Sequence, residues 1–247
     1  MQNRYVADVG DFGKYALLRI ITKTDLKLGV NWYLTPDESH NLDGKHTSYL
    51  HKDSYRGYDD DLYRIMKDII DGRKRNVHSV QESGILPSST VFCDSALDLT
   101  GESNPVKRRI IRQSWHNAAL NRLQDCEIIF PDPDNGLQVK SVSLTGQKGS
   151  KYIGLDELKD YYKHGKSIIF YNHRERKQEE AYLDKFRKLK DDPAFIGSEW
   201  IGLKFVGGTI RDYIFILQPK HFHPVKTQFD ALLKTSWKGN FSQLSLL

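Results

Sequence analysis

The sequence predicts an α/β fold: a mostly parallel sheet flanked by helices and closed by a C-terminal antiparallel β-hairpin. Short apolar blocks alternate along the chain with longer amphipathic stretches, as in parallel strands joined by helices. Turn-forming residues end most of the apolar blocks. Near the carboxyl end, the β-rich segments 200–206 and 213–217 flank the turn residues Gly207-Gly208, which indicates a hairpin.

Four apolar blocks are expected to form the parallel strands. They are residues 28–34, 90–93, 127–131 and 167–171. Thr35-Pro36 stops the first block, and the third is followed by the turn formers of 132–136. Each block is therefore bounded as a buried strand should be.

Amphipathic spacing predicts the helices. They are residues 12–23, 59–71, 105–123, 155–162 and 175–190. Asp11 is expected to be the N-cap of the first helix, and Gly72 ends the second. About the last 25 residues read as a weakly specified helix and tail. We expect one domain over 1–247, with a loop and helical insertion at 37–88.

Composition restricts the class of protein. The chain has 247 residues, and its hydrophobic content of 38% is that of an ordinary globular domain. No apolar stretch is long enough to span a bilayer, and the amino-terminal residues lack the pattern of a signal peptide. Its only two cysteines, Cys93 and Cys126, exclude a disulfide framework and suggest buried, reduced thiols. We therefore expect a cytoplasmic protein without a membrane partner.

The segment 127–138, EIIFPDPDNGLQ, carries the main functional signal. It delivers Asp132, Asp134 and Asn135 directly after a buried strand. In open α/β sheets ligands bind beyond the carboxyl ends of the strands, where such side chains do chemistry. The alternative is a turn in which these side chains only satisfy local backbone groups.

Three segments resemble motifs of methyltransferases. Asp132-Pro133-Asp134-Asn135 resembles the Asp/Asn-Pro-Pro-aromatic motif that follows the fourth strand of amino-methyltransferases. Residues 91–97 resemble a strand ending in Asp-Ala-x-x-Leu, whose acid faces the cofactor adenine. Residues 5–15 resemble the His-Ala-Gly-Asn-x-Ala-Asp-x-x-Lys-His opening of the J-type rRNA adenine-N6 methyltransferases, which use S-adenosylmethionine. This resemblance and the terminal hairpin imply a Rossmann-like sheet of the class I methyltransferases.

The resemblance implies roles for individual residues. Asp132 would accept a hydrogen bond from the amine that is methylated. The expected catalytic set is Asp132, Asp134, Asn135 and His173, the last as a general base after the fourth strand. The residues expected to bind S-adenosylmethionine are Lys14, Tyr15, Tyr33, Asp37, Asp94 and Ser95.

The sequence departs from the methyltransferase pattern at two places. Residues 32–38 stand where a Gly-x-Gly-x-Gly turn normally lets backbone approach the cofactor. Asn135 stands where an aromatic ring normally stacks on an extruded base. A non-catalytic nucleic-acid-binding protein on a degenerate methyltransferase scaffold is therefore an alternative.

A metal-dependent nuclease or phosphohydrolase is a further alternative. Asp132, Asp134 and Lys140 form a loose Pro-Asp…Gln-x-Lys pattern, in which acids hold Mg²⁺ and a lysine positions water. A polar loop also follows the first strand and mixes carboxylates with imidazoles, which could line an active site, bind a divalent metal or only be solvated. Its residues are Asp37, Glu38, His40, Asp43, Lys45 and His46.

A nucleic-acid partner is compatible with the charge. The net charge is +5 and the pI is about 9.0. Basic side chains expected to contact phosphates, or otherwise only to solvate helix faces, are Arg73, Lys74, Arg75, Arg108, Arg109 and Lys151. The sequence leaves the oligomeric state open.

Overall fold

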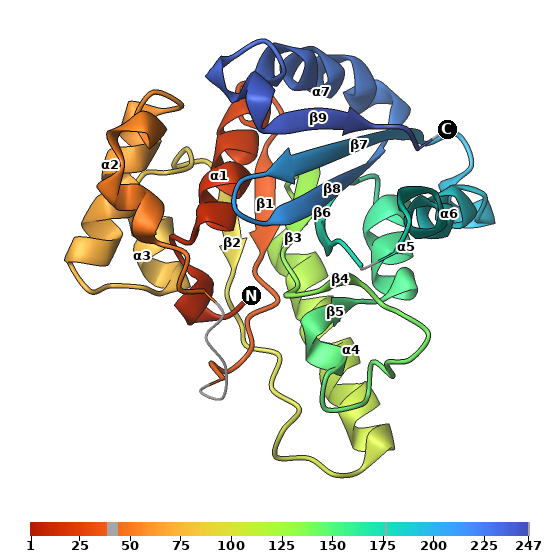
Figure 1. The fold of residues 1–247 in the computed structure, drawn as a ribbon. Helices are drawn as coiled ribbons and strands as arrows, with labels where there is room; N and C mark the ends of the chain where they lie inside the picture. Colours follow the sequence, from red (N-terminus) through yellow and green to blue (C-terminus); the bar gives the residue numbers. More distant parts are fainter. Residues whose placement is uncertain (39–43, 176, 247) are drawn as a thin grey trace.

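A seven-stranded sheet runs through the protein, seen here in a computed structural model that describes residues 1–38, 44–175 and 177–246 (Figure 1). The strand order is β2-β1-β3-β6-β8-β7-β9. The strands are β1 (Leu28–Asn31), β2 (Val91–Cys93), β3 (Ile128–Pro131), β6 (Ser167–His173), β7 (Glu199–Val206), β8 (Ile210–Leu217) and β9 (Phe241–Leu244). A separate parallel pair joins β4 (Gly136–Leu137) to β5 (Tyr152–Ile153).

The first four strands of the sheet order are parallel, as expected. β8 lies antiparallel to both β6 and β7, and β9 is antiparallel to β7. In the register, Asn31 pairs with Cys93 on one side and with Pro131 on the other. The strands β2, β1 and β3 therefore end level at one edge of the sheet. The chain order reverses between β1 and β3, and this is the point at which open sheets bind ligands.

Helices cover both faces of the sheet. They are α1 (Val9–Ile21), α2 (Asp60–Asp71), α3 (Val77–Glu82), α4 (Pro105–Arg122), α5 (Leu155–Lys163), α6 (Glu179–Lys190) and α7 (Pro219–Leu232). α1 and α7 lie on one face with α2 and α3 outside α1, whereas α4, α5 and α6 lie on the other face (Figure 1). Short 3₁₀ turns occur at Asn3–Tyr5, Ser48–His51, Asp53–Tyr55, Gly149–Lys151, Pro193–Phe195 and Ser236–Gly239. The predicted fold class is confirmed.

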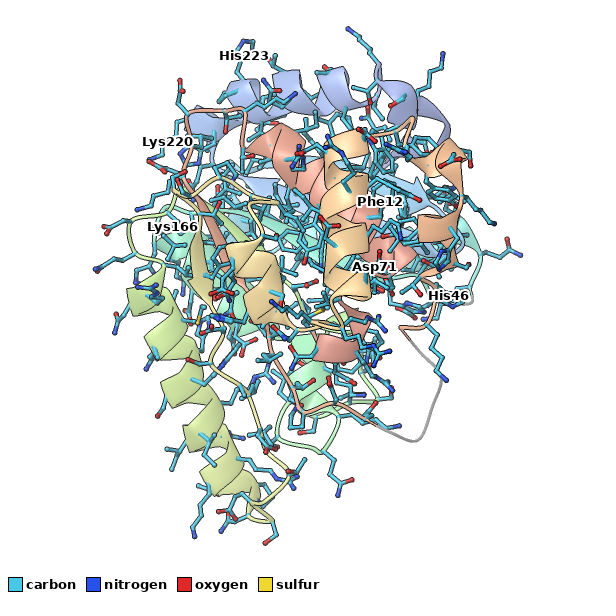
Figure 2. The ribbon with its side chains drawn as sticks, turned by 90° about the vertical axis from the view of Figure 1, so that its left-hand side faces the viewer. Phe12, His46, Asp71, Lys166, Lys220 and His223 are labelled. Carbon is cyan, nitrogen blue, oxygen red and sulfur yellow. The ribbon has the colours of Figure 1, made fainter. Side chains whose placement is uncertain are left out.

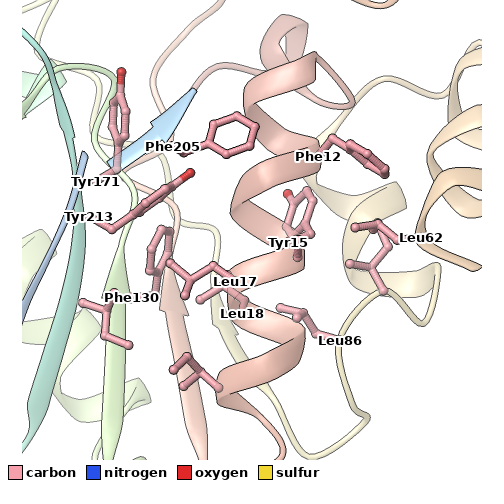
Figure 3. Close-up of a cluster of buried hydrophobic side chains, with 14 of the residues drawn as sticks. Phe12, Tyr15, Leu17, Leu18, Leu62, Leu86, Phe130, Tyr171, Phe205 and Tyr213 are labelled. Atoms are coloured by element: carbon pink, nitrogen blue, oxygen red, sulfur yellow. The ribbon is translucent and has the colours of Figure 1, made fainter. Parts of the chain in front are cut away.

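Two hydrophobic cores result because successive strand residues point to opposite faces. In β3, Phe130 belongs to the core under α1, whereas Ile129 belongs to the core under α4 and α5. Figure 3 shows the first of these cores, where Leu17 and Leu18 of α1 face Phe130 and Tyr213 of the sheet. Both cysteines are buried free thiols, as predicted.

Several predicted boundaries are wrong, and one of them is the start of β8, which lies at Ile210 rather than at residue 213. α1 begins at Val9, and Asp8 is its N-cap because its side chain accepts a hydrogen bond from the Asp11 backbone N–H. The first strand ends at Asn31 rather than at residue 34, since Tyr33 takes a left-handed φ of 46° that no strand allows. α6 begins at Glu179 rather than at residue 175.

The segment after the hairpin is more ordered than its sequence suggests. α7 has 14 residues, and β9 then returns to pair with β7 at the edge of the sheet. β9 is held because Phe241 and Leu244 are buried while the two residues between them are exposed. Helix α3 was not predicted at all. No helix among the described residues is both long and apolar enough to cross a bilayer.

Candidate active site

A cavity of about 350 Å³ opens at the carboxyl ends of β3 and β6. The amino-terminal turn of α1 and the β7–β8 hairpin complete its walls. Its polar lining includes Asp8, Asp11, Lys14, His46, Asp132, Asp134, Asn135, Tyr171, His173, Thr209 and Arg211. Segments from both ends of the chain and from its middle therefore meet at one edge of the sheet.

A buried lysine between two carboxylates forms the floor of this cavity. Lys14 Nζ lies 2.7 Å from Asp132 Oδ2 and 2.8 Å from Asp11 Oδ1. Lys14 is 2% exposed, and its ammonium also lies over the rings of Tyr15 and Trp32, at 4.9 and 5.4 Å from their centroids. The charge is thus fully compensated by acids and ring faces inside the protein.

Burial shapes the acid–base behaviour of this trio. Removal from water raises the pKa of Asp11 to about 6, although Lys14 opposes the change. Burial by itself would lower the pKa of Lys14, but Asp11 and Asp132 outweigh it and raise that pKa. Lys14 therefore stays charged at neutral pH, while Asp11 changes its protonation state not far below it.

A second ion pair forms the opposite wall. Arg211, at the start of β8, places Nη2 at 3.2 and 3.0 Å from the two carboxylate oxygens of Asp8. Its guanidinium lies over the Tyr171 ring, 5.5 Å from the centroid. Gly10 permits this arrangement, because a Cβ there would lie 1.7 Å from Arg211 Cζ. The hairpin is thereby fastened to the amino terminus of α1.

The first two residues of the chain lie between the ends of β1 and β3. The backbone nitrogen of Met1 donates to the carbonyls of Tyr33 and Asp132, at 3.0 and 2.9 Å, and lies 2.8 Å from Asp134 Oδ1. Gln2 Nε2 donates to Asp134 Oδ2 at 2.8 Å. The Asp134 carboxylate is therefore held by this segment at the point where the sheet order reverses.

The cavity is rich in acids. Its four carboxylates outnumber its three cationic groups, which are Lys14, Arg211 and the Met1 ammonium; the acids are Asp8, Asp11, Asp132 and Asp134. Such a lining favours a ligand that is cationic or that donates hydrogen bonds, and it disfavours a phosphate group.

The structure brings the predicted catalytic residues together. Asp132, Asp134, Asn135 and His173 all line the cavity. His173 Nδ1 lies 3.0 Å from the Tyr171 hydroxyl. Asp132, Asp134 and Asn135 follow the end of β3 and His173 ends β6, so they meet because these two parallel strands are neighbours.

The predicted cofactor-binding residues are more scattered. Lys14 lines the cavity, and Tyr15 is buried beside it without lining it. Tyr33 points to the other face of the sheet, where its hydroxyl donates to Glu157 at 3.1 Å. Asp37 is exposed and accepts a hydrogen bond from the Arg4 backbone N–H.

Asp94 and Ser95 follow β2 at the same sheet edge as Asp132, but both are exposed and outside the cavity lining. Asp94 Oδ2 accepts a hydrogen bond from Gln81 Nε2 at 3.3 Å. The Ser95 carbonyl accepts one from the Trp115 indole. These two residues and Asp132 therefore share an edge without sharing a cavity.

The metal-dependent alternative gains no geometric support. Within residues 1–38, 44–175 and 177–246, no three His, Cys, Asp or Glu side chains are grouped to hold a metal ion. Lys140 is exposed and outside the cavity lining. Of the polar loop, His46 reaches the cavity and Glu38 pairs with Lys151.

Three other residues of the polar loop are His40, Asp43 and Lys45. His40 and Asp43 lie outside the described residues, and Lys45 is exposed.

Half of the predicted phosphate contacts have structural roles. Arg75 donates to the backbone carbonyls of Arg4, Val6 and Gly44. Arg108 donates to the carbonyls of Glu102 and Thr145, and Lys151 pairs with Glu38. The exposed members of the set are Arg73, Lys74 and Arg109.

The sequence interpretation missed several residues of the cavity: Asp8, Asp11 as a buried acid, Tyr171 and Arg211. Asp8 and Asp11 lie within the opening that resembles the J-type enzymes, which was a usable signal. No signal in the sequence pointed to Arg211, because its role depends on the hairpin folding back over α1.

Comparisons with known proteins add little to this geometry. No family model matches the chain, and no curated protein matches it significantly. Among solved structures, the DUF519 protein LPL1258 from Legionella pneumophila str. Philadelphia 1 is similar over 97% of this chain and 96% of its own. The TM-score is 0.45 and the sequence identity is 14%.

Proposed function

We propose that this chain is a methyltransferase-like enzyme that uses S-adenosylmethionine to methylate an amino group of a nucleic-acid base or nucleotide. The observation that carries the proposal is the position of Asp132. Its carboxylate stands at the carboxyl end of β3, held at 2.7 Å by Lys14 on the floor of an acid-rich cavity. The strand order supports the proposal, because a closing antiparallel hairpin is typical of class I methyltransferases. Here the reversed strand β8 lies between β6 and β7, which run parallel to each other.

The acidic side chains of the cavity suit the positive charge of S-adenosylmethionine. S-adenosylmethionine, when bound, supplies a methyl group on a positively charged sulfur. Asp11, Asp132 and Asp134 line the cavity and would attract such a positive charge, and a low-polarity interior would strengthen the attraction. Asp94 and Ser95 would have to serve the adenine from outside the cavity lining.

The chain's own residues would orient the amine. An exocyclic amine is a weak nucleophile because its lone pair is delocalised into the ring. A hydrogen bond from this amine to Asp132 would localise the lone pair and aim it. Lys14 fixes the carboxylate for this task, and His173 stands at the cavity wall as a base for the released proton.

The Met1–Gln2 segment sets a condition on this proposal. It lies between the ends of β1 and β3 and holds the Asp134 carboxylate. A ligand that enters at the reversal of the sheet order must displace this segment. We therefore expect cofactor binding to be accompanied by a rearrangement of the first residues.

Calorimetric titration with S-adenosylmethionine tests the proposal directly. Wild type should release or absorb heat and melt at a higher temperature with the compound present. Asp132→Asn should still bind S-adenosylmethionine, although its melting temperature should fall because the substitution removes a buried ion pair with Lys14. Its transfer of labelled methyl groups to total RNA, genomic DNA or free nucleotides should fall roughly 10²-fold.

Asp98→Asn, an exposed acid after β2, is the matched control and should keep full transfer. Absence of both a heat signal and a thermal shift for wild type would contradict the proposal. Full transfer by Asp132→Asn would remove the role assigned to that residue.

A further inference from the structure

The amino-terminal part of α4 projects from the body of the protein. None of residues 105–111 is buried, and the first buried side chain of the helix is Arg112. Figures 1 and 2 both show this end of α4 extending past its neighbours, so the projection does not depend on the view. We refer to residues 105–111 as the α4 tip.

The α4 tip exposes aliphatic side chains. Val106 is 66% exposed, Ile110 is 58% exposed and Ile111 is 39% exposed. Val106 and Ile110 are four residues apart and lie on one ridge, which faces away from the buried side of the helix at Arg112 and Trp115. Single exposed apolar residues are ordinary, but a cluster of them on a projecting helix indicates a contact surface.

The charge of the helix restricts what can cover this surface. α4 contains no acidic residue, and its basic residues are Lys107, Arg108, Arg109, Arg112 and Arg122. Arg108 and Arg112 are occupied by contacts within the protein. Lys107 and Arg109 are exposed beside Val106 and Ile110, and Lys107 Nζ is as far as 3.8 Å from Glu102.

We propose that the α4 tip is a docking surface for nucleic acid, with Lys107 and Arg109 on phosphates and Val106 and Ile110 against sugars or bases. The partial positive charge at the start of a helix adds to this attraction. A second copy of the chain fits less well, because two α4 tips would face each other with like charges. This inference takes its partner from the proposed function, but its test requires no methyl transfer.

The position of the α4 tip agrees with such a partner. α4 follows the carboxyl end of β2, which ends level with β1 and β3. The tip thus lies toward the sheet edge that carries the acid-rich cavity (Figure 1). That cavity disfavours phosphate, so a basic surface outside it would hold the strand while a base or amine enters.

Fluorescence anisotropy tests the inference with three labelled probes: an RNA hairpin, an RNA of equal length without self-complementary segments, and a DNA duplex with the sequence of the hairpin stem. Lys107→Gln/Arg109→Gln should weaken binding of the preferred probe roughly tenfold, and it should lower the slope of log affinity against log salt by about 2. The control Lys188→Gln/Lys190→Gln removes the same charge from α6 and should change affinity less than about twofold.

A second variant and its control test the aliphatic side chains of the α4 tip. Ile110→Ser should weaken binding several-fold and leave the salt slope unchanged, since it removes no charge. Ile196→Ser changes an isoleucine that is 79% exposed elsewhere on the surface, and it should have no effect. Equal affinities for the α4 variants and their controls would overturn the inference.

Two further outcomes would also overturn it. One is wild type that binds none of the probes, and the other is a dimer in sedimentation that Ile110→Ser dissociates. Calorimetry with S-adenosylmethionine on the same proteins separates the two proposals. If wild type binds nucleic acid through the α4 tip but does not bind S-adenosylmethionine, only the proposed function is contradicted.

Discussion

Lys14 Nζ of α1 and Asp132 Oδ2 at the end of β3 lie 2.7 Å apart in the interior, although 118 positions separate them in the chain. This contact joins the helix that opens the fold to the strand end that carries the most conspicuous acids. It also orients the Asp132 carboxylate at the cavity. The pair is therefore both a structural tie and the basis of the proposed chemistry.

Lys14→Met should strongly destabilise the protein. The substitution leaves Asp11 and Asp132 buried without their shared cation, and breaking a buried pair in this way costs about 3–5 kcal/mol. Urea unfolding followed by circular dichroism measures the loss. Lys67→Met, which removes an exposed pair with Asp71, is the control and should leave the midpoint unchanged. Equal midpoints for the two variants would contradict the prediction.

The stability of the wild type should depend on pH through Asp11. Burial raises the pKa of Asp11 from 3.8 to about 6, so in this window the folded state holds a proton that the unfolded chain releases. The stabilisation that Asp11 gives by holding this proton is fully present below pH 3.8, the pKa of the unfolded chain. It is lost as pH rises through about 6, the pKa in the folded state.

Asp11→Asn removes this titration. The free energy of unfolding of wild type relative to Asp11→Asn should fall by about 3 kcal/mol between about pH 4 and pH 7. Urea titrations of both proteins across this range measure the difference. A difference that is constant with pH would show that Asp11 titrates normally.

Gly10→Ala should displace Arg211. The new Cβ would lie 1.7 Å from Arg211 Cζ, so the guanidinium has to leave Asp8 and the Tyr171 ring. We expect a loss of about 1–3 kcal/mol in unfolding free energy. Gly101→Ala, at a glycine with nothing within 4 Å of the added atom, is the control and should be neutral.

A double-mutant cycle checks that cause. In an Arg211→Ala background the cost of Gly10→Ala should largely vanish, because the clashing group is gone. An unchanged cost in that background would place the strain in the backbone of α1 instead.

Arg112→Met should release α4 from α5. Arg112 Nε lies 2.7 Å from Glu157 Oε1, and both side chains are buried. Burial would raise the pKa of Glu157, but Arg112 outweighs it and lowers that pKa. The pair therefore stabilises the fold above the ordinary pKa of glutamate, and this is lost as pH falls through the lowered value.

At neutral pH the variant should lose about 3–5 kcal/mol in urea unfolding. The loss should shrink on acidification, because Glu157 without its partner can take up a proton. The control is Arg109→Met, three residues earlier on the exposed side of the same helix, and it should change the unfolding free energy little. A loss independent of pH would indicate packing rather than charge as the cause.

Local pattern was sufficient for the architecture and for part of the site. The apolar blocks, the Gly207-Gly208 turn and the helical spacings predicted the parallel strands, the hairpin and five helices close to where they lie. The strand-end rule also brought Asp132, Asp134 and His173 to one cavity. These features follow from the sequence because they depend on neighbouring residues and on the parallel direction of the strands.

Other features were decided only by how distant segments dock. Asp8 and Arg211 are 203 positions apart, and Arg75 reaches the backbone near Arg4 from the insertion. β9 was not predicted, because an edge strand is stabilised by the partner it meets, here β7.

The sequence by itself determined the α/β class, the hairpin and the acids at the strand ends, since periodicity and turn chemistry act over a few residues. The tertiary structure decided that Lys14 compensates Asp132, that Asp94 stays outside the cavity, and that Met1 lies between β1 and β3. Burial of charge is the physical reason. Its cost depends on the partners that folding supplies, and no local pattern in the chain specifies those partners.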